Sequence, residues 1–157
     1  MSNLKIMFDL QDYLRGKPLG ELTCDKVLCP HGDVLPALFV EQVDDVRVLH
    51  VEGRANTQAG VEIVLSSIEG LALGDRFTVV GRQSPSLLGA SITMFSKEEN
   101  DVEFVCHKPY NNMYSLSCLL AADTIRQSLY LSFVKTGSQF SGIDFCVDGV
   151  LIVRKER

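Results

Sequence analysis

Thiol and imidazole side chains gather in the first fifth of the sequence, where Cys24, Cys29 and His31 lie close together. These side chains are ligands that zinc prefers, but a closed zinc site needs four of them. No second pair of cysteine or histidine residues has the spacing that would complete the site. The chain has five cysteines, and an odd number cannot all pair within one chain. The sequence therefore favours cysteines in loops or in the core over a metal site.

A second group of polar residues separates two strand-like runs in the segment LHVEGRANTQAGVEIVL, which begins at Leu49. The loop ANTQA follows Arg54 and is longer than the two-residue turn that closes a simple hairpin. Arg54 and Gln58 can both donate hydrogen bonds. The loop therefore predicts a binding edge between the two strands.

Side chains that could perform catalysis are scattered. The sequence contains no G-x-S-x-G, H-E-x-x-H, G-x-G-x-x-G or P-loop motif. Glu62 and Asp144 are acids of the kind that glycosidases use in pairs, but nothing in their spacing brings them together. We expect that the protein is not an enzyme.

Charge and hydropathy exclude two classes of partner. The net charge of −5 argues against nucleic acid, because no basic stripe is present to neutralise phosphates. No apolar run approaches the roughly 20 residues of a membrane helix. The N-terminal residues lack the pattern of a signal peptide, so we expect either a domain of a longer secreted, extracellular protein or a cytoplasmic protein.

The dominant hydrophobic period is two, which is typical of strands with one buried face. Alternating runs recur every 10 to 15 residues between turn segments such as LALGD, KEEND and KTGSQFSG. This spacing predicts an all-β fold, a two-sheet antiparallel β-sandwich, with under about a tenth of the residues in helices. We expect one domain over residues 1–157, in which residues 1–36 form an irregular covering segment with an edge strand or a short helix.

The alternation also predicts which residues lie between the two sheets. Each of these residues falls on the apolar side of its predicted strand. They are Ile63, Phe104, Leu116, Leu131 and Phe145.

The order of the runs resembles the carbohydrate-binding modules of families 4, 9 and 22. The central match is LHVEGRANTQAGVEIVLSSIEGLALGDRFTVVGRQ, in which Gly53 and Arg54 stand where those modules have a Gly-Arg-Thr strand end. The closing match is LYLSFVKTGSQFSGIDFCVDGVLIV, which is similar to the last strand pair of the family. The resemblance covers residues 40–155 and implies a jelly-roll fold.

The resemblance implies a non-catalytic module that binds a polysaccharide or oligosaccharide, such as xylan or a β-glucan, on a concave sheet. Aromatic rings stack on sugar rings, and polar side chains bind the hydroxyl groups. The expected partners also include a glycoside hydrolase in the same chain or complex. The candidate ligand-binding residues are Arg54, Gln58, Arg82, Phe95, Tyr110 and Tyr130.

The resemblance also implies one structural calcium ion, held by Asp9 and Asp148. One difference supports an alternative function, because Gln58 and Met113 stand where the family has tryptophans, and this chain has none. The alternative is a jelly-roll domain for protein interaction or structure that has lost glycan binding.

Overall fold

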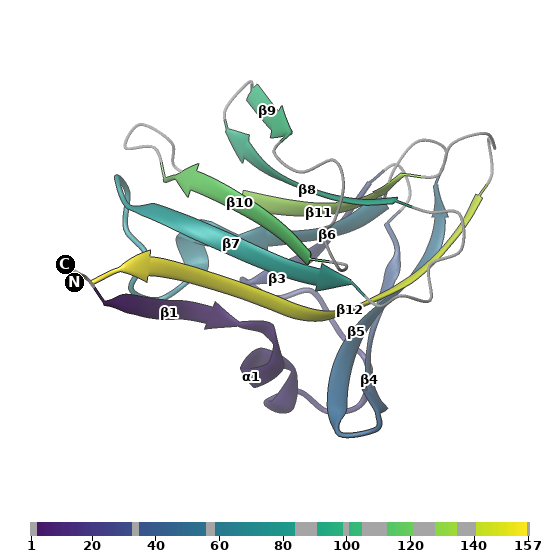
Figure 1. Cartoon of the computed structure of the whole chain (residues 1–157). Coiled ribbons are helices and arrows are strands. Elements are labelled where there is room, and N and C mark those ends of the chain that lie inside the picture. The colour runs from purple at the N-terminus through teal and green to yellow at the C-terminus, as the bar shows by residue number, and fades with distance from the viewer. Residues whose placement is uncertain are drawn as a thin grey trace.

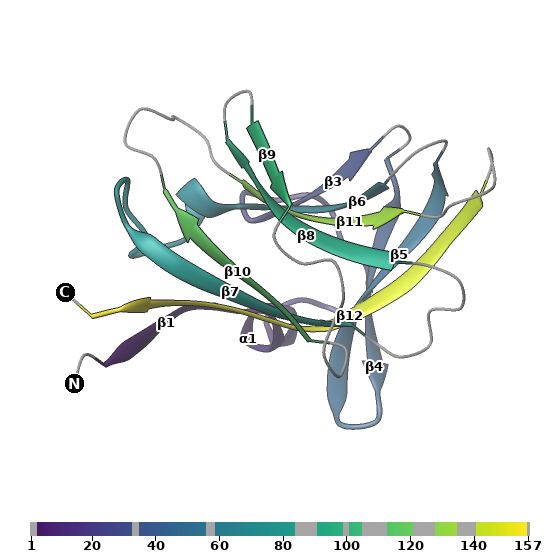
Figure 2. The ribbon, with the colours of Figure 1, turned by 45° about the horizontal axis from the view of Figure 1, so that its top comes forward.

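A computed structural model describes residues 3–32, 35–55, 59–83, 91–98, 101–104, 113–120, 128–134 and 141–156. The strands form two antiparallel sheets that stack as layers, as Figures 1 and 2 show from two directions. Helix is almost absent from the described residues. The predicted all-β sandwich is confirmed.

The first layer is a seven-stranded sheet with the order β10-β7-β12-β5-β4-β2, and β1 pairs with β12. Its strands are β1 (Leu4–Asp9), β2 (Gly20–Glu21), β4 (Ala37–Val43), β5 (Val46–Ala55), β7 (Arg76–Gln83), β10 (Met113–Leu119) and β12 (Ser141–Lys155). A tight turn joins β4 to β5, and in it Asp44 adopts a φ of 54°. Aspartate tolerates this left-handed conformation better than most residues.

The second layer is a five-stranded sheet with the order β3-β6-β11-β8-β9. Its strands are β3 (Leu28–Gly32), β6 (Ala59–Val64), β8 (Ser91–Glu98), β9 (Asp101–Phe104) and β11 (Ser128–Val134). A short 3-10 helix, η1 (Leu65–Ser67), follows β6. Figure 2 shows this sheet above the seven-stranded one, with β9 at its margin.

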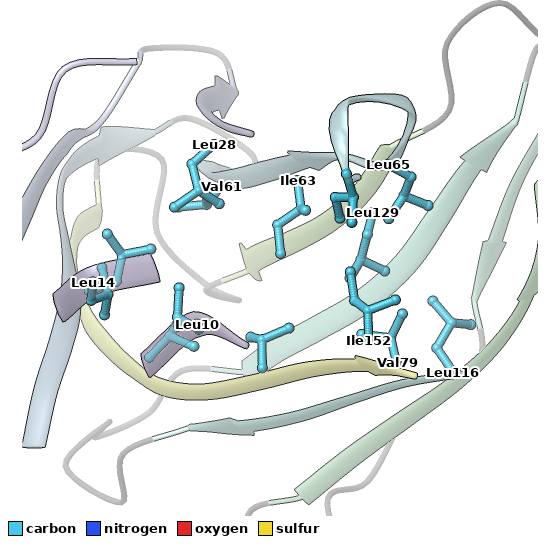
Figure 3. Close-up of a cluster of buried hydrophobic side chains, with 14 of the residues drawn as sticks. Leu10, Leu14, Leu28, Val61, Ile63, Leu65, Val79, Leu116, Leu129 and Ile152 are labelled. Carbon is cyan, nitrogen blue, oxygen red and sulfur yellow. The ribbon is translucent and has the colours of Figure 1, made fainter. Parts of the chain in front are cut away.

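The hydrophobic core lies between the sheets. Figure 3 shows Ile63 and Leu129 of one sheet and Val79 and Leu116 of the other within one cluster of buried side chains. Ile63 and Leu116 are each 1% exposed, so their predicted burial is confirmed. Because burial removes apolar surface from water, this cluster is the main source of stability.

Strand register tests the other predicted core positions. Leu131 pairs with Val61, and Phe145 pairs with Val51. Both of these partners are buried, which agrees with the prediction. Phe104 pairs with Phe95 instead and falls in register with the alternate positions of the five-stranded sheet. The register therefore aligns Phe104 with Glu62 rather than with the buried positions, which contradicts the prediction that Phe104 lies between the two sheets.

Residues 1–36 are more regular than predicted, because they supply β1, β2, β3 and the helix α1 (Leu10–Arg15). The Asp9 side chain accepts a hydrogen bond from the Gln11 amide and thereby caps the N-terminus of the helix. Leu10 and Leu14 are one helical turn apart and are buried in the core. The helix is therefore part of the packed structure, not only a cover.

The Gln11 side chain fastens α1 to two strands. Its Nε2 donates to the carbonyl oxygen of Arg47 at 2.6 Å and to that of Asp148 at 2.5 Å. The amide of Arg47 donates in return to Gln11 Oε1 at 3.4 Å. The Asp148 carbonyl lies where the register between β12 and β7 shifts, between Val147 and Gly149. Gln11 thus satisfies backbone groups at an irregular point of the sheet.

The two ends of the described chain lie side by side (Figure 1). Leu4 pairs with Lys155, and the amide of Glu156 donates to the carbonyl oxygen of Asn3 at 2.8 Å. Among the described residues, no helix is long and apolar enough to cross a membrane.

Candidate functional site

The outer face of the five-stranded sheet brings aromatic and carboxylate positions into one row. On β6, Val61 and Ile63 are buried in the core, whereas Glu62 between them remains 22% exposed. Because side chains alternate along a strand, positions in register with Glu62 belong to the outer face. This central row consists of Cys29, Glu62, Tyr130, Phe95 and Phe104, one residue from each strand of the sheet.

Two further rows of outer-face positions flank the central row. The row toward one end of the strands consists of His31, Gly60, Ser132 and Thr93. The row toward the other end consists of Val64, Ser128, Lys97 and Val102. The outer face thus combines three aromatic positions with the imidazole of His31, the carboxylate of Glu62 and the hydroxyl of Ser128. This composition is suited to a ligand with apolar faces and many hydroxyl groups.

Glu62 is held in place by the two flanking rows. His31 Nδ1 lies 3.0 Å from Glu62 Oε2, and the Ser128 hydroxyl donates to Glu62 Oε1. A carboxylate has about four acceptor positions, so each oxygen keeps capacity for another donor. A ligand hydroxyl can therefore bind a carboxylate whose position is already fixed.

The structure brings together only some of the predicted ligand-binding residues. Tyr130 and Phe95 are direct register partners on β11 and β8. Arg54 lies on β5 opposite Gly142, and Arg82 lies on β7 opposite Met113, so both arginines belong to the seven-stranded sheet. Gln58 and Tyr110 lie outside the described residues.

The two acids considered for hydrolysis lie on different sheets and have separate histidine partners. Asp144 Oδ1 lies 2.5 Å from His50 Nε2, and Glu41 Oε1 lies 2.7 Å from His50 Nδ1. Burial lowers the pKa of His50, but the hydrogen bonds and negative charges of Glu41 and Asp144 outweigh burial and raise it. Glu62 and Asp144 thus serve separate ionic clusters.

The contacts of Glu62 were not predicted, because they join residues that are far apart in the sequence. His31 precedes Glu62 by 31 residues, and Ser128 follows it by 66. Alternation in β6 indicated that Glu62 faces outward, but only the pairing of β3, β6 and β11 reveals its neighbours. No local motif contains this information.

Asp9 and Asp148, the predicted calcium ligands, both make hydrogen bonds within the fold. Asp9 Oδ1 accepts from the backbone of α1, and the carbonyl oxygen of Asp148 accepts from Gln11. Calcium takes six to eight oxygens, and no group of three or more possible ligand side chains occurs in the described part of the chain. The calcium ion at Asp9 and Asp148 therefore stays a prediction.

Comparison with solved structures identifies the architecture. The CBM22-1 xylan-binding domain from Paenibacillus barcinonensis superposes with a TM-score of 0.61 at 12% identity, over 99% of this chain and 97% of that domain. The chain has the β-sandwich fold of the CBM22 domains. The CBM22-1–CBM22-2 tandem domain from the same organism gives a TM-score of 0.58 at 12% identity, over 100% of this chain and 46% of the tandem.

A third similar structure joins such a domain to a catalytic one. It is the Clostridium thermocellum endo-1,4-beta-D-xylanase 10B CBM22-1–GH10 pair complexed with xylohexaose, with a TM-score of 0.52 at 18% identity, over 89% of this chain and 29% of that one. No protein-family model matches the sequence, and no curated protein matches it either. The resemblance to carbohydrate-binding modules is thus confirmed at the level of the fold.

Proposed function

We propose that the protein is a non-catalytic carbohydrate-binding module whose ligand lies on the outer face of the five-stranded sheet. The observation that supports this most is the central row, in which the positions of Tyr130, Phe95 and Phe104 are consecutive across three strands. The CBM22 fold supports the same class of function, because a domain with this fold is described as xylan-binding.

The geometry of the row suits a linear chain of sugars. Neighbouring strands are about 4.8 Å apart, so three consecutive positions span roughly 10 Å. An aromatic pair contributes about 0.5–1.5 kcal/mol beyond its buried area. With few such contacts and no tryptophan, we expect dissociation constants in the micromolar to millimolar range, which correspond to about −8 to −4 kcal/mol.

Charge narrows the class of polysaccharide to neutral glycans such as xylan or a β-glucan. The net charge is −5, and Glu62 offers a carboxylate in the central row, beside Tyr130. An anionic polysaccharide would be repelled by this charge, whereas neutral hydroxyl groups can donate to it.

Affinity electrophoresis in gels containing xylan, mixed-linkage glucan or polygalacturonate tests the proposal. We expect xylan or the glucan to slow the protein and polygalacturonate to have no effect. Tyr130→Ala and Phe95→Ala should each migrate faster than the parent in the gel that slows the parent. Circular dichroism on both variants verifies that the sandwich is intact.

Phe39→Ala is the matched control, since Phe39 is a half-buried aromatic residue on β4 of the other sheet. This variant should be slowed as much as the parent. If Tyr130→Ala and Phe95→Ala are also slowed as much as the parent, the glycan binds elsewhere. If no polysaccharide slows the parent, the protein is not a module for these glycans.

A protein-interaction domain is the second candidate function. On the edge strand β1, Leu4 is 65% exposed and Ile6 is 58% exposed. Exposed apolar side chains on an edge strand are suited to contact with another protein. Gel filtration of the parent and of Ile6→Lys would reveal an association that depends on this strand.

A polysaccharide ligand also bears on the location of the protein and on its functional partner. A polysaccharide partner implies an extracellular location as part of a secreted protein. A glycoside hydrolase in the same chain or complex is the expected functional partner, because a bound module keeps the enzyme at its substrate. Both elements fail if glycan binding fails.

A further inference from the structure

Two thiols lie in contact in the segment that enters β3. The Sγ atoms of Cys24 and Cys29 are 2.8 Å apart, and both cysteines are free. A disulfide has a sulfur–sulfur distance of about 2.05 Å. A displacement of less than one ångström would therefore bring the two sulfurs to bonding distance.

The turn between the two cysteines is held by Asp25. Its amide donates to the carbonyl oxygen of Leu28 at 3.1 Å, and its Oδ1 accepts from the amides of Val27 at 2.8 Å and Leu28 at 3.0 Å. Because residues 25 and 28 pair across the turn, residues 24 and 29 form the next facing pair. Facing positions on antiparallel segments lie about 4.5–5.5 Å apart between Cα atoms, which is within the range of disulfides.

The Asp25 carboxyl that holds this turn is ionised at neutral pH. Burial raises the pKa of Asp25, but hydrogen bonds from Tyr13, from the amides of Leu28 and Val27 and from Lys17 outweigh burial and lower it to about 2. Asp25 therefore remains a carboxylate at neutral pH and continues to accept these hydrogen bonds. The facing arrangement of the thiols does not depend on a nearby titration.

We propose that Cys24 and Cys29 are a thiol–disulfide site that is oxidised by small disulfide compounds of the glutathione type. Cys24 is the exposed thiol, so its thiolate attacks one sulfur of the oxidant and expels the other sulfur as a thiolate. The Cys29 thiolate then attacks Cys24 Sγ and expels the second thiolate. The two protons of the cysteines end on the two released thiolates. Two electrons pass from the protein thiols to the oxidant.

The second step limits the rate at neutral pH. In the reduced pair, burial, the hydrogen bond with Cys24 and the negative charges of Glu62 and Asp25 raise the pKa of Cys29 to about 12, and burial and the two carboxylates continue to raise it once Cys24 has reacted. Only a small fraction of Cys29 is therefore a thiolate at pH 7. Closure of the disulfide should become faster with increasing pH from 7 to 9.

The disulfide would secure an edge of the proposed binding face. In the described sheet β3 pairs with β6 alone, and Cys29 is in register with Glu62. The bond would join this edge strand to the segment that precedes it. The chemistry of the two thiols is independent of glycan binding, so either proposal can fail without the other.

Incubation of the purified full chain with oxidised glutathione tests the site. Free thiols are titrated in denaturant, and the bridge is located by peptide mapping without reduction. We expect the number of free thiols to fall by two, with a peptide that joins Cys24 to Cys29. The melting temperature should rise by about 4–8 °C, and dithiothreitol should reverse both changes.

Three variants separate this bridge from other thiol reactions. Cys24→Ser and Cys29→Ser should form no internal bridge, and Cys29→Ser should retain a glutathione adduct on Cys24. Cys146→Ser is the matched control, because Cys146 is also half-buried and free, and it should still lose two thiols. The proposal is overturned if the parent loses no free thiols, joins a different pair or still retains an adduct on Cys24 at pH 9.

Discussion

Replacement of Gln11 should detach α1 from the seven-stranded sheet. Gln11 Nε2 donates two hydrogen bonds, to the carbonyl oxygens of Arg47 and Asp148. Because those residues lie 36 and 137 positions away in the sequence, the two bonds join the helix to distant strands. Gln11→Ala would remove both donors. Gln11→Glu would instead place acceptor oxygens against the two carbonyl oxygens.

The magnitude follows from the two hydrogen bonds. Each is worth a net 0.5–1.5 kcal/mol, and a buried carbonyl that loses its donor adds a desolvation cost. Arg47 and Asp148 are partly buried rather than fully buried, so water satisfies part of the loss. We expect Gln11→Ala to lower the free energy of unfolding by about 2–3 kcal/mol. Gln11→Glu should lower it further at pH 7.

Urea denaturation followed by circular dichroism gives the free energies by linear extrapolation. Gln42→Ala is the matched control, since the exposed Gln42 side chain donates to the carbonyl oxygen of Asp44 within its own turn. This control should lose less than about 0.5 kcal/mol. If Gln11→Ala loses no more than Gln42→Ala, Gln11 does not hold the helix and the reasoning is refuted.

Three further outcomes are expected. The pKa of His50 is raised in the folded state, so the stability that the charged imidazole contributes is present below about pH 6.5 and is lost as the pH rises through the folded pKa. The difference in free energy of unfolding between the parent and His50→Asn should therefore shrink as the pH increases. A difference that is constant with pH would contradict this. A bound calcium ion would raise the melting temperature relative to chelator, by the equivalent of about 2.7 kcal/mol at a hundredfold excess over its dissociation constant; equal melting temperatures would exclude it. Phe104→Ala should weaken binding to xylan. It should also lower the free energy of unfolding less than Ile63→Ala, which should cost about 2–5 kcal/mol. If Phe104→Ala lowers the free energy of unfolding more than Ile63→Ala, Phe104 lies in the core.

The sandwich could be predicted from the sequence, because the alternation of apolar and polar residues along each strand can be read from the chain alone. Ile63 and Leu116 occupy the inner faces that their runs indicated. Phe104 shows the limit of this reasoning. In its segment DVEFVC, Val102, Phe104 and Cys106 alternate with Asp101, Glu103 and Val105, so alternation alone indicates the apolar side of the strand but not which face of the sheet that side joins. Only the pairing with β8 determines which face each position joins.

The candidate site could be predicted only in part, for a related reason. Tyr130 and Phe95 were expected to bind ligand, and the register makes them neighbours. The contact of Cys24 with Cys29 was not predicted, because their spacing was weighed only against a zinc site and the Asp25 turn was not recognised. An Asp that is followed closely by a strand was the local signal for that turn.

The adjacent chain ends have a mechanical consequence. Strands β1 and β12 are antiparallel neighbours, and both chain ends lie at the same end of this pair. A force that pulls the two ends apart therefore acts across the strands and breaks their hydrogen bonds one after another, beginning at Leu4 and Lys155. A protein tethered through both ends would yield first by peeling of β1, at lower force than a pair loaded in shear. The five-stranded sheet would be unaffected by this first event.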